Sequence, residues 1–324
     1  MVVLVTGGTG FLGAHVIDQL LELNTPVRAT KRLESRIPAG LQDRVGLQWV
    51  DADIQDYFAL EEAFKDVSQV YHCAAQVSYD PSQRAQMRQV NVEGTAQVVN
   101  LCVQHQARLV HVSSIAALGQ NPEGGDTSES DLWEYDAGLS AYSVAKYESE
   151  MEVWRGFAEG LKGVIVNPSL IIGASAGSKG SGAIFHLLNK GLTYYPTGSV
   201  GLVDVEDVAR AMIQLMARQD ISGDRYLISH VNMTHRELLA QCSAYLNRAV
   251  PKRKATPMLL EIAWRAAKVI AWLQGRKPAL TKESARISSK KLRFTNKKLV
   301  DTLQFTFKPM EQTLKEICDQ VQQK

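Results

Sequence analysis

Hydrophobic positions in the first 170 residues gather in short runs rich in Val, Ile and Leu, which longer helix-like stretches separate. Several runs are apolar at nearly every position, which is typical of strands buried on both faces of a parallel sheet. Strands that alternate with helices predict an α/β fold with a doubly wound parallel sheet. The six runs are MVVLVTG, PVRAT, GLQWVDA, QVYHCAA, ARLVHVSS and LKGVIVNPS.

This pattern loosens after residue 170. Gly- and Ser-rich loops are followed by a predicted helix near 204–217, a predicted strand near 225–229 and several further helices. The later helices lack the regular alternation with strands. They predict a smaller part that is added to the sheet.

A separate apolar stretch, MLLEIAWRAAKVIAWLQ, is predicted to be a helix. Its charges, Glu261, Arg265 and Lys268, lie in one stripe at helical spacing, and three charges in seventeen residues exclude a membrane-spanning helix. We expect an amphipathic helix that covers the substrate side or a subunit contact. Binding to a membrane surface is the alternative.

A glycine-rich loop follows the first strand and matches T-G-x-x-G-x-x-G from residue 6 to residue 13. Glycine lets the backbone turn tightly and approach a pyrophosphate, whose charge the N–H groups of the following helix attract. The order of strand, loop and amphipathic helix predicts a Rossmann fold that binds a dinucleotide, and a merely tight turn is the alternative. The predicted contacts are Thr6, Gly7, Gly10, Phe11, Leu12 and Gly13.

The end of the second predicted strand bears on the choice between NAD and NADP. An NAD site usually has an Asp or Glu there, about twenty residues beyond the glycines. This chain instead has Arg28, Lys31 and Arg32, with no acid before Glu34. Cations favour a 2'-phosphate, so NADP is predicted as the cofactor over NAD; a solvated basic loop is the alternative.

These patterns divide the chain into two parts. Residues 1–168 are predicted to form the dinucleotide-binding domain, and 200–230 to return to it. Residues 169–199 and 231–324 are predicted to form the smaller substrate-binding part.

Composition is that of an ordinary globular protein, with 45% hydrophobic and 22% charged residues, which argues against disorder. The net charge is only +2, but residues 251–298 hold fourteen Lys or Arg against Glu261 and Glu283. That stretch carries +12 and the remainder −10. A solvated helical face is the first interpretation; an anionic substrate group, a membrane surface or an acidic partner are the others.

Metal and disulfide chemistry are not indicated. The four cysteines lie far apart without a C-x-x-C pair, and the seven histidines show no metal-ligand spacing. The N-terminal residues pass directly into an apolar run with no basic lead, so we expect no secretion signal and a cytoplasmic location. No nucleic-acid partner is expected.

A tyrosine and a lysine four residues apart, Tyr142 and Lys146, complete a recognisable set of motifs. Together with the glycine loop and VSS at 112–114, they resemble the extended short-chain dehydrogenase/reductase family over nearly the whole chain. VRATKR, VYHCAA, VNVEGT, NPSLIIGA and VDVEDVA are similar to its dihydroflavonol reductase, cinnamoyl-CoA reductase and 3β-hydroxysteroid dehydrogenase branch.

The resemblance implies a role for each member of the set. Tyr142 would be the general acid in reduction and the base in oxidation, because hydride addition leaves negative charge on the substrate oxygen. Lys146 would favour the phenolate and hold the nicotinamide ribose. Ser114 would hydrogen-bond to the substrate oxygen, with Ser113 the weaker candidate.

Helical geometry separates this pair from an apolar stripe on the same helix. Tyr142 and Lys146 are predicted to lie opposite the stripe, which should face the core. The stripe consists of Val144, Tyr147, Met151, Trp154 and Ala158.

Other positions match cofactor contacts of the family. They are Asp53, Ile54, Ala74, Ala75, Ser113, Pro168 and Ser169. Asn91, Asp204 and Asp207 are interpreted as structural, and His72 as a core histidine with satisfied hydrogen bonds.

The predicted function is an NADP-dependent oxidoreductase that interconverts a carbonyl and a secondary alcohol on a small molecule. The family resemblance allows a homodimer. One alternative is a nucleotide-sugar epimerase or dehydratase, although Ser114 is followed by Ile115, Ala116 and Ala117 and not by the acidic pair of the dehydratases. The other is a non-catalytic sensor that binds the dinucleotide.

Overall fold

The computed structural model describes residues 2–136, 138–178, 180–275 and 280–323. Its centre is a seven-stranded sheet in the order β10-β6-β5-β4-β1-β2-β3, in which every neighbouring pair is parallel. All six predicted runs form strands, and the strand predicted near 225–229 joins them at the edge. The strands are β1 (Val2–Thr6), β2 (Val27–Lys31), β3 (Leu47–Asp51), β4 (Val67–His72), β5 (Arg108–Val112), β6 (Gly163–Pro168) and β10 (Asp224–Ile228).

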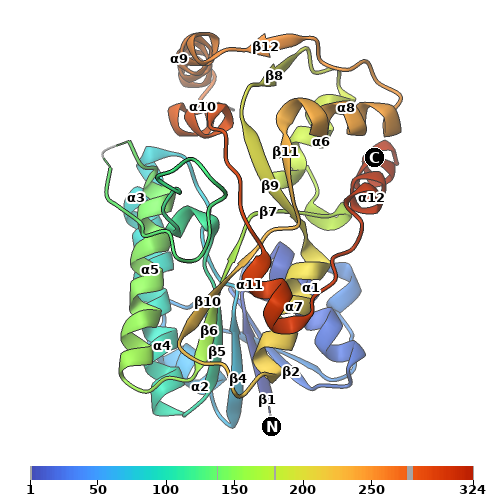
Figure 1. The fold of residues 1–324 in the computed structure, drawn as a ribbon. Coiled ribbons are helices and arrows are strands. Elements are labelled where there is room, and N and C mark those ends of the chain that lie inside the picture. The colour runs from blue at the N-terminus through green and yellow to red at the C-terminus, as the bar shows by residue number, and fades with distance from the viewer. Residues whose placement is uncertain (1, 137, 179, 276–279, 324) are drawn as a thin grey trace.

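Helices cover both faces of this sheet (Figure 1). Because side chains alternate along a strand, Val3 and Val5 of β1 pack into one core with helices α1 and α7, and Leu4 packs into the other with α4 and α5. The doubly wound α/β fold is therefore confirmed. The helices on the sheet are α1 (Phe11–Glu22), α2 (Tyr57–Ala63), α3 (Arg84–Arg88), α4 (Gly94–Gln104), α5 (Ala141–Ala158) and α7 (Val205–Ala217).

A smaller part lies beyond the carboxyl ends of the strands, at the top of Figure 1. Its three-stranded sheet has the order β11-β9-β7, and β12 pairs with β8 beside it. A third core, which includes Phe185, Leu202 and Leu314, holds it together. Its elements are β7 (Leu170–Ile172), α6 (Ala183–Asn189), β8 (Tyr194–Pro196), β9 (Ser199–Asp204), β11 (Val231–Thr234), α8 (His235–Tyr245), β12 (Arg253–Ala255), α9 (Pro257–Leu273), α10 (Lys282–Ser289) and α12 (Met310–Gln322).

One helix of the C-terminal region returns to the main sheet. Helix α11 (Lys297–Leu303) packs beside β10, and Leu299 is buried in the first core. Tertiary contacts thus bind the C-terminal region to the main sheet as well as to the smaller part.

The four cysteines are free thiols, and Cys102, Cys242 and Cys318 are buried. Among the described residues, no helix is both long and apolar enough to cross a membrane. No group of His, Cys, Asp and Glu in the same residues is arranged to hold a metal ion.

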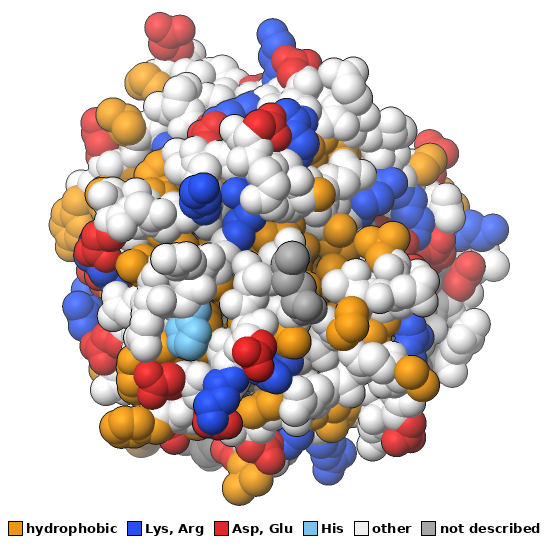
Figure 2. All heavy atoms as spheres, turned by 90° about the horizontal axis from the view of Figure 1, so that it is seen from below, with side chains coloured by type: hydrophobic (Ala, Val, Ile, Leu, Met, Phe, Trp, Pro, Cys, Tyr) orange, Lys and Arg blue, Asp and Glu red, His pale blue; other side chains and the backbone are white. Residues whose placement is uncertain are grey.

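The amino ends of the strands form the face at the opposite end from α9. Figure 2 shows this face from below, where Lys and Arg side chains are interspersed with Asp and Glu. This mixture is typical of a solvated surface.

Arg108 joins the start of β5 to the end of α7. Its buried guanidinium donates to the carbonyls of Met216 at 3.2 Å, Leu215 at 3.3 Å, Arg218 at 2.9 Å and Ile221 at 2.7 Å. A cation at this position satisfies carbonyls that the end of a helix leaves without partners and is favoured by the helix dipole.

Replacing this side chain should therefore destabilise the fold. We expect Arg108→Leu to lower the free energy of unfolding by about 2–4 kcal/mol, because buried carbonyls lose their donor. Urea denaturation measures this change. Arg88→Leu, which removes an exposed arginine from surface ion pairs, should stay within about 0.5 kcal/mol; equal losses in the two variants would contradict the role of Arg108.

Candidate active site

The glycine loop between β1 and α1 has no room for side chains at two of its positions. Gly7 has a φ of +69°, and a Cβ atom there would lie 2.7 Å from the backbone of Ala74. A Cβ atom at Gly13 would lie 2.3 Å from the Gly7 carbonyl oxygen. This tight backbone turn at the start of α1, here called the cradle, fits the pyrophosphate of a dinucleotide.

Helix α1 begins directly after Gly10, whose carbonyl accepts the Ala14 N–H at 3.0 Å. The amides of Phe11, Leu12 and Gly13 form the first turn, where N–H groups have no acceptor within the helix. The structure places these residues at the loop, and their contact with a cofactor stays a prediction. Thr6 differs, because its buried hydroxyl hydrogen-bonds to His72 Nδ1 at 2.7 Å and braces the loop from beneath.

The cations at the end of β2 separate into different roles. The guanidinium of Arg28 donates to the carbonyls of Ala63 and Lys65, at 2.9 and 2.7 Å, in the turn that precedes β4. That turn lies at the amino edge of the sheet, away from the glycine loop. The prediction that Arg28 binds the 2'-phosphate is therefore wrong, because its guanidinium is hydrogen-bonded to the backbone of Ala63 and Lys65 at the other edge.

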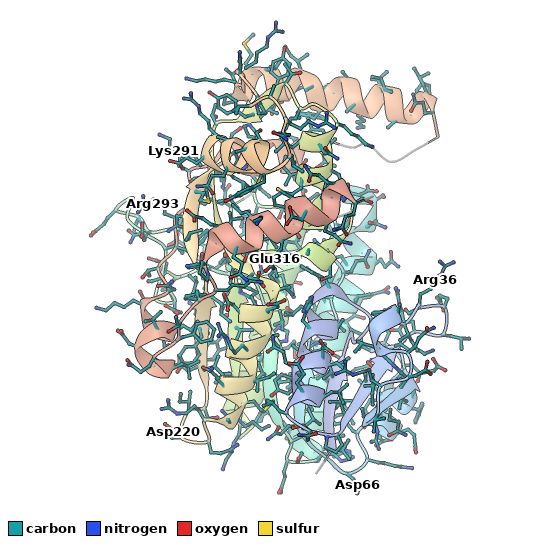
Figure 3. The ribbon with its side chains drawn as sticks, turned by 90° about the vertical axis from the view of Figure 1, so that its right-hand side faces the viewer. Arg36, Asp66, Asp220, Lys291, Arg293 and Glu316 are labelled. Atoms are coloured by element: carbon teal, nitrogen blue, oxygen red, sulfur yellow. The ribbon has the colours of Figure 1, made fainter. Side chains whose placement is uncertain are left out.

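Lys31 and Arg32 remain at the carboxyl edge. Lys31 is ion-paired with Asp51 of the neighbouring strand β3, which offsets its charge. Arg32 is exposed directly after β2, and Arg36 projects from the loop that follows (Figure 3). The pairing with Asp51 was missed in the sequence because it depends on the parallel register of β2 and β3.

The loops after β3 and β4 border the same cradle. Asp53 accepts the Gln55 N–H at 3.0 Å, and Ile54 is buried against Gly94. Ala74 lies against Gly7, and Ala75 beside it is exposed. The structure thus places Ala74 at the loop, as the prediction requires.

Buried polar residues support this region. The side chain of Asn91 accepts the Gln76 N–H at 2.7 Å and donates to the Gln76 carbonyl at 2.9 Å, so it braces the loop after β4. His72 bonds to Thr6 and to Thr95, and burial lowers its pKa to about 3. The interpretation of His72 as a core histidine with satisfied bonds is confirmed.

Ser114, Tyr142 and Lys146 come together at the carboxyl end of β5. The hydroxyl of Ser114 lies near that of Tyr142 and acts to lower its pKa. Lys146 Nζ donates to the Val112 carbonyl at 2.9 Å, two residues before Ser114. The end of β5 supplies the Ser114 hydroxyl, and one turn of α5 supplies the Tyr142 hydroxyl and the Lys146 ammonium.

The orientation of α5 differs from the sequence prediction. Its most buried residues are Ser143, Lys146, Glu150, Val153 and Gly156, whereas the predicted apolar stripe is only half-buried or exposed. The prediction that Lys146 faces away from the core is wrong. The reason is that this helix packs a polar face inward, where each buried polar group has a specific partner.

Burial changes the pKa values of both Tyr142 and Lys146. It raises the pKa of Tyr142 to about 12, although the neighbouring Ser114 hydroxyl acts in the opposite direction. It lowers the pKa of Lys146 to about 8, against the attraction of Glu150. We expected Lys146 to lower the pKa of Tyr142; in this structure the removal of the phenol from water outweighs any such effect.

Glu150 is the group that the sequence analysis missed. Its carboxylate is fully buried and accepts bonds from Ser113 Oγ at 2.7 Å, Asn167 Nδ2 at 2.8 Å and Arg225 Nη1 at 3.0 Å. Asn167 also donates to the Ser114 carbonyl at 3.0 Å. Its signal in the sequence was its position, one helical turn after Lys146 on the same face.

This network also settles the position of Ser113. Its hydroxyl donates to Glu150 beneath the site, so Ser113 helps to hold the site together. At the end of β6, Pro168 and Ser169 are buried, and Ser169 Oγ has no hydrogen-bond partner among the described residues. An unpartnered hydroxyl at this edge fits a ligand group better than a purely structural role does.

Comparison with known proteins adds to this geometry. The model of the NAD dependent epimerase/dehydratase family matches residues 3–229. The chain belongs to this family. Its members include NAD(P)-dependent reductases, dehydratases and epimerases, so the prediction of an enzyme of the oxidoreductase type is confirmed.

Two relatives carry reductase names. The chain is 31% identical over 318 residues to a protein of Synechocystis sp. named "Putative dihydroflavonol 4-reductase", covering 96% of this chain and 91% of that one. It is 31% identical over 251 residues to cinnamoyl-CoA reductase CAD2 of Medicago truncatula, covering 71% and 76%. The predicted resemblance to this branch of the epimerase/dehydratase family is confirmed.

A solved structure shows the same fold. UDP-glucose 4-epimerase of Thermus thermophilus in complex with NAD has a TM-score of 0.77, with 22% identity and 99% coverage of both chains. That epimerase carries NAD on the fold found here.

Loss of the Glu150 charge should destabilise the folded protein. We expect Glu150→Gln to lower the free energy of unfolding by about 3 kcal/mol or more, because the buried Arg225 loses its counter-charge. The measurement is chemical denaturation at neutral pH.

A matched control lies on the same helix. Glu152 pairs with Arg155 at the surface, so Glu152→Gln should change the free energy of unfolding by less than about 1 kcal/mol. A Glu150 variant as stable as this control would show that the buried carboxylate does not support the site.

Proposed function

We propose that the protein is an NADP-dependent reductase that interconverts a carbonyl and a secondary alcohol with a Ser-Tyr-Lys site. The neighbouring hydroxyls of Ser114 and Tyr142, with the ammonium of Lys146 one helical turn further along α5, carry this proposal. They lie at the edge of the sheet that also holds the glycine cradle. In this arrangement, two donors can meet one substrate oxygen.

The chemistry divides between the cofactor and the side chains. The dinucleotide, when bound, supplies or accepts the hydride. The hydroxyls of Ser114 and Tyr142 bind the substrate oxygen, and Tyr142 donates its proton as negative charge develops there. Since burial raises the pKa of Tyr142 to about 12, the phenol is protonated at neutral pH and ready to act as the acid in reduction.

Lys146 contributes a positive charge beneath the pair. Its ammonium donates to the Val112 carbonyl, and its remaining donors can hold a ribose hydroxyl of the cofactor. With its pKa lowered to about 8, the group is still mostly charged at pH 7. The ammonium of Lys146 disfavours further positive charge nearby, and it favours the phenolate form of Tyr142 in the oxidation direction.

We assign the two parts of the chain to cofactor and substrate. Residues 1–168 and 200–230 would bind the dinucleotide through the glycine cradle, Asp53, Ala74 and Ser169. The loops 173–199 and the C-terminal helices would cover the substrate. Tyr79 already packs edge-on against Tyr142 with ring centroids 6.0 Å apart, so the pocket beside the acid has an aromatic wall.

The relatives named as reductases favour a fairly apolar carbonyl substrate. Arg32, exposed after β2, favours NADP over NAD. The homodimer and the cytoplasmic location remain predictions.

A nucleotide-sugar epimerase is the second candidate, because the fold is that of UDP-glucose 4-epimerase. Incubation with UDP- or dTDP-sugars and chromatography of the products distinguishes the two, since only an epimerase or dehydratase alters these sugars without net consumption of cofactor. A dinucleotide sensor without activity is disfavoured because Ser114, Tyr142 and Lys146 are all present.

The proton donor can be tested by removal of one oxygen atom. We expect Tyr142→Phe to lower kcat in a carbonyl reduction assay by about 10²–10⁴-fold, because the substrate oxygen loses its acid. Binding of NADPH, measured by fluorescence titration, should change little. Tyr147→Phe on the same helix, where Tyr147 stacks on Trp133, is the control and should keep its activity; a Tyr142 variant that still turns over would refute the assignment.

The cofactor preference depends on one exposed cation. We expect Arg32→Gln to raise the Kd for NADPH by roughly tenfold to a hundredfold and to leave the Kd for NADH nearly unchanged, because a charge-assisted bond to the 2'-phosphate is lost. Calorimetric titration of both cofactors measures this. Arg44→Gln, which removes a cation paired with Asp18, should alter neither; a wild-type protein that prefers NADH would contradict the proposal.

A further inference from the structure

Helix α9 exposes an unusually apolar surface. Seven of the eighteen large hydrophobic side chains that are exposed among the described residues lie on this one helix. Only Leu260 and Ala271 of the helix are buried, and Leu260 belongs to a small core with Ala255 and Ala285. The seven are Met258, Leu259, Ile262, Val269, Ile270, Trp272 and Leu273.

These side chains gather on one side of the helix. Met258, Ile262, Val269 and Leu273 follow a line at helical spacing that points away from the buried side, and the exposed Arg265 lies on this line between Ile262 and Val269. Trp272 is 79% exposed, and Met258 is 75% exposed. Contiguous apolar surface of this kind marks an interaction site, whereas single exposed hydrophobic residues do not.

Positive charge surrounds the stripe. Helix α10 packs alongside α9, and strand β12 lies at the same end of the molecule (Figure 1). Lys291 and Arg293, in the segment after α10, also lie toward this end (Figure 3). Exposed cations of β12, α9, α10 and the next segment are Lys252, Arg253, Lys254, Arg265, Lys268, Lys282, Arg286, Lys290, Lys291 and Arg293.

The apolar side of α9 and the cations around it together indicate what this helix binds. We propose that α9 docks this protein on the surface of an anionic lipid bilayer, with its apolar stripe in the boundary between headgroups and acyl chains. An amphipathic helix with Lys and Arg beside its apolar face binds such a surface, and anionic headgroups match the basic segment.

A second copy of the chain is a poorer match. A twofold interface on α9 would bring the same patch of both copies together. It would place two segments of charge +12 against each other, which like-charge repulsion disfavours. The opposite end of the molecule, where both signs are mixed (Figure 2), offers no such preference for an anionic surface.

Docking would place the bilayer close to the proposed site. Glu283 of α10 lines the same cavity as Ala141, the residue before Tyr142. The helix beside α9 therefore lies close to the start of α5. The inference itself rests on α9 and its charges and is independent of the proposed activity.

Vesicle flotation of the full chain, without cofactor or substrate, tests the proposal. We expect vesicles of phosphatidylcholine and phosphatidylglycerol to bind at least about ten times more protein than vesicles of phosphatidylcholine alone, and high salt to release it. The double variant Ile262→Asp with Val269→Asp should lose about tenfold or more of this binding. Both side chains are more than half exposed, so its unfolding curve should match that of the wild type.

The control variant changes an exposed apolar side chain elsewhere. Val45, which is 95% exposed and far from α9, is replaced in Val45→Asp, and binding should be unchanged. Trp272→Phe provides a second measurement, because it should remove the blue shift of tryptophan fluorescence that vesicles cause in the wild type.

Three results would overturn the proposal. They are the absence of flotation with anionic vesicles, equal binding by the α9 variant, and a wild-type dimer that the α9 variant converts to a monomer without any vesicle binding. The last result would make α9 a subunit contact.

Discussion

The buried carboxylate of Glu150 is the interaction on which the candidate site depends. It joins α5 to β5 through Ser113, to β6 through Asn167 and to the edge strand β10 through Arg225. A charge without water is stable only when several donors surround it, so these elements must meet at one point. Ser114 and Lys146, which lie within this frame, are positioned as a consequence.

A second constraint comes from the parallel sheet. All seven strands end at the same edge, so the loops after β1, β2, β4, β5 and β6 meet there although they are distant in sequence. The glycine cradle, Arg32, Ala74, Ser114 and Ser169 are brought together by this topology. Binding at the carboxyl edge is general for open parallel sheets, and the smaller part lies above it as a cover.

Burial has opposite effects on the two ionisable groups of the site. It raises the pKa of Tyr142 and lowers the pKa of Lys146, because in both cases the neutral form is favoured away from water. A protonated phenol suits the reduction of a carbonyl. The same physical cause therefore keeps the proposed acid protonated and reduces the positive charge of Lys146.

Local patterns in the sequence determined the strands of the main sheet, the glycine turn and the identity of the Ser-Tyr-Lys set, because each depends on near neighbours in the chain. Only the tertiary structure decided that Arg28 bonds at the far edge, that Asp51 offsets Lys31, and that α5 turns a polar face inward to Glu150. These outcomes depend on strand register and on partners more than a dozen residues away, which no periodicity along one helix can show. The apolar stripe of α9 was visible in the sequence as well, but its exposure to solvent was decided by how few elements pack against it.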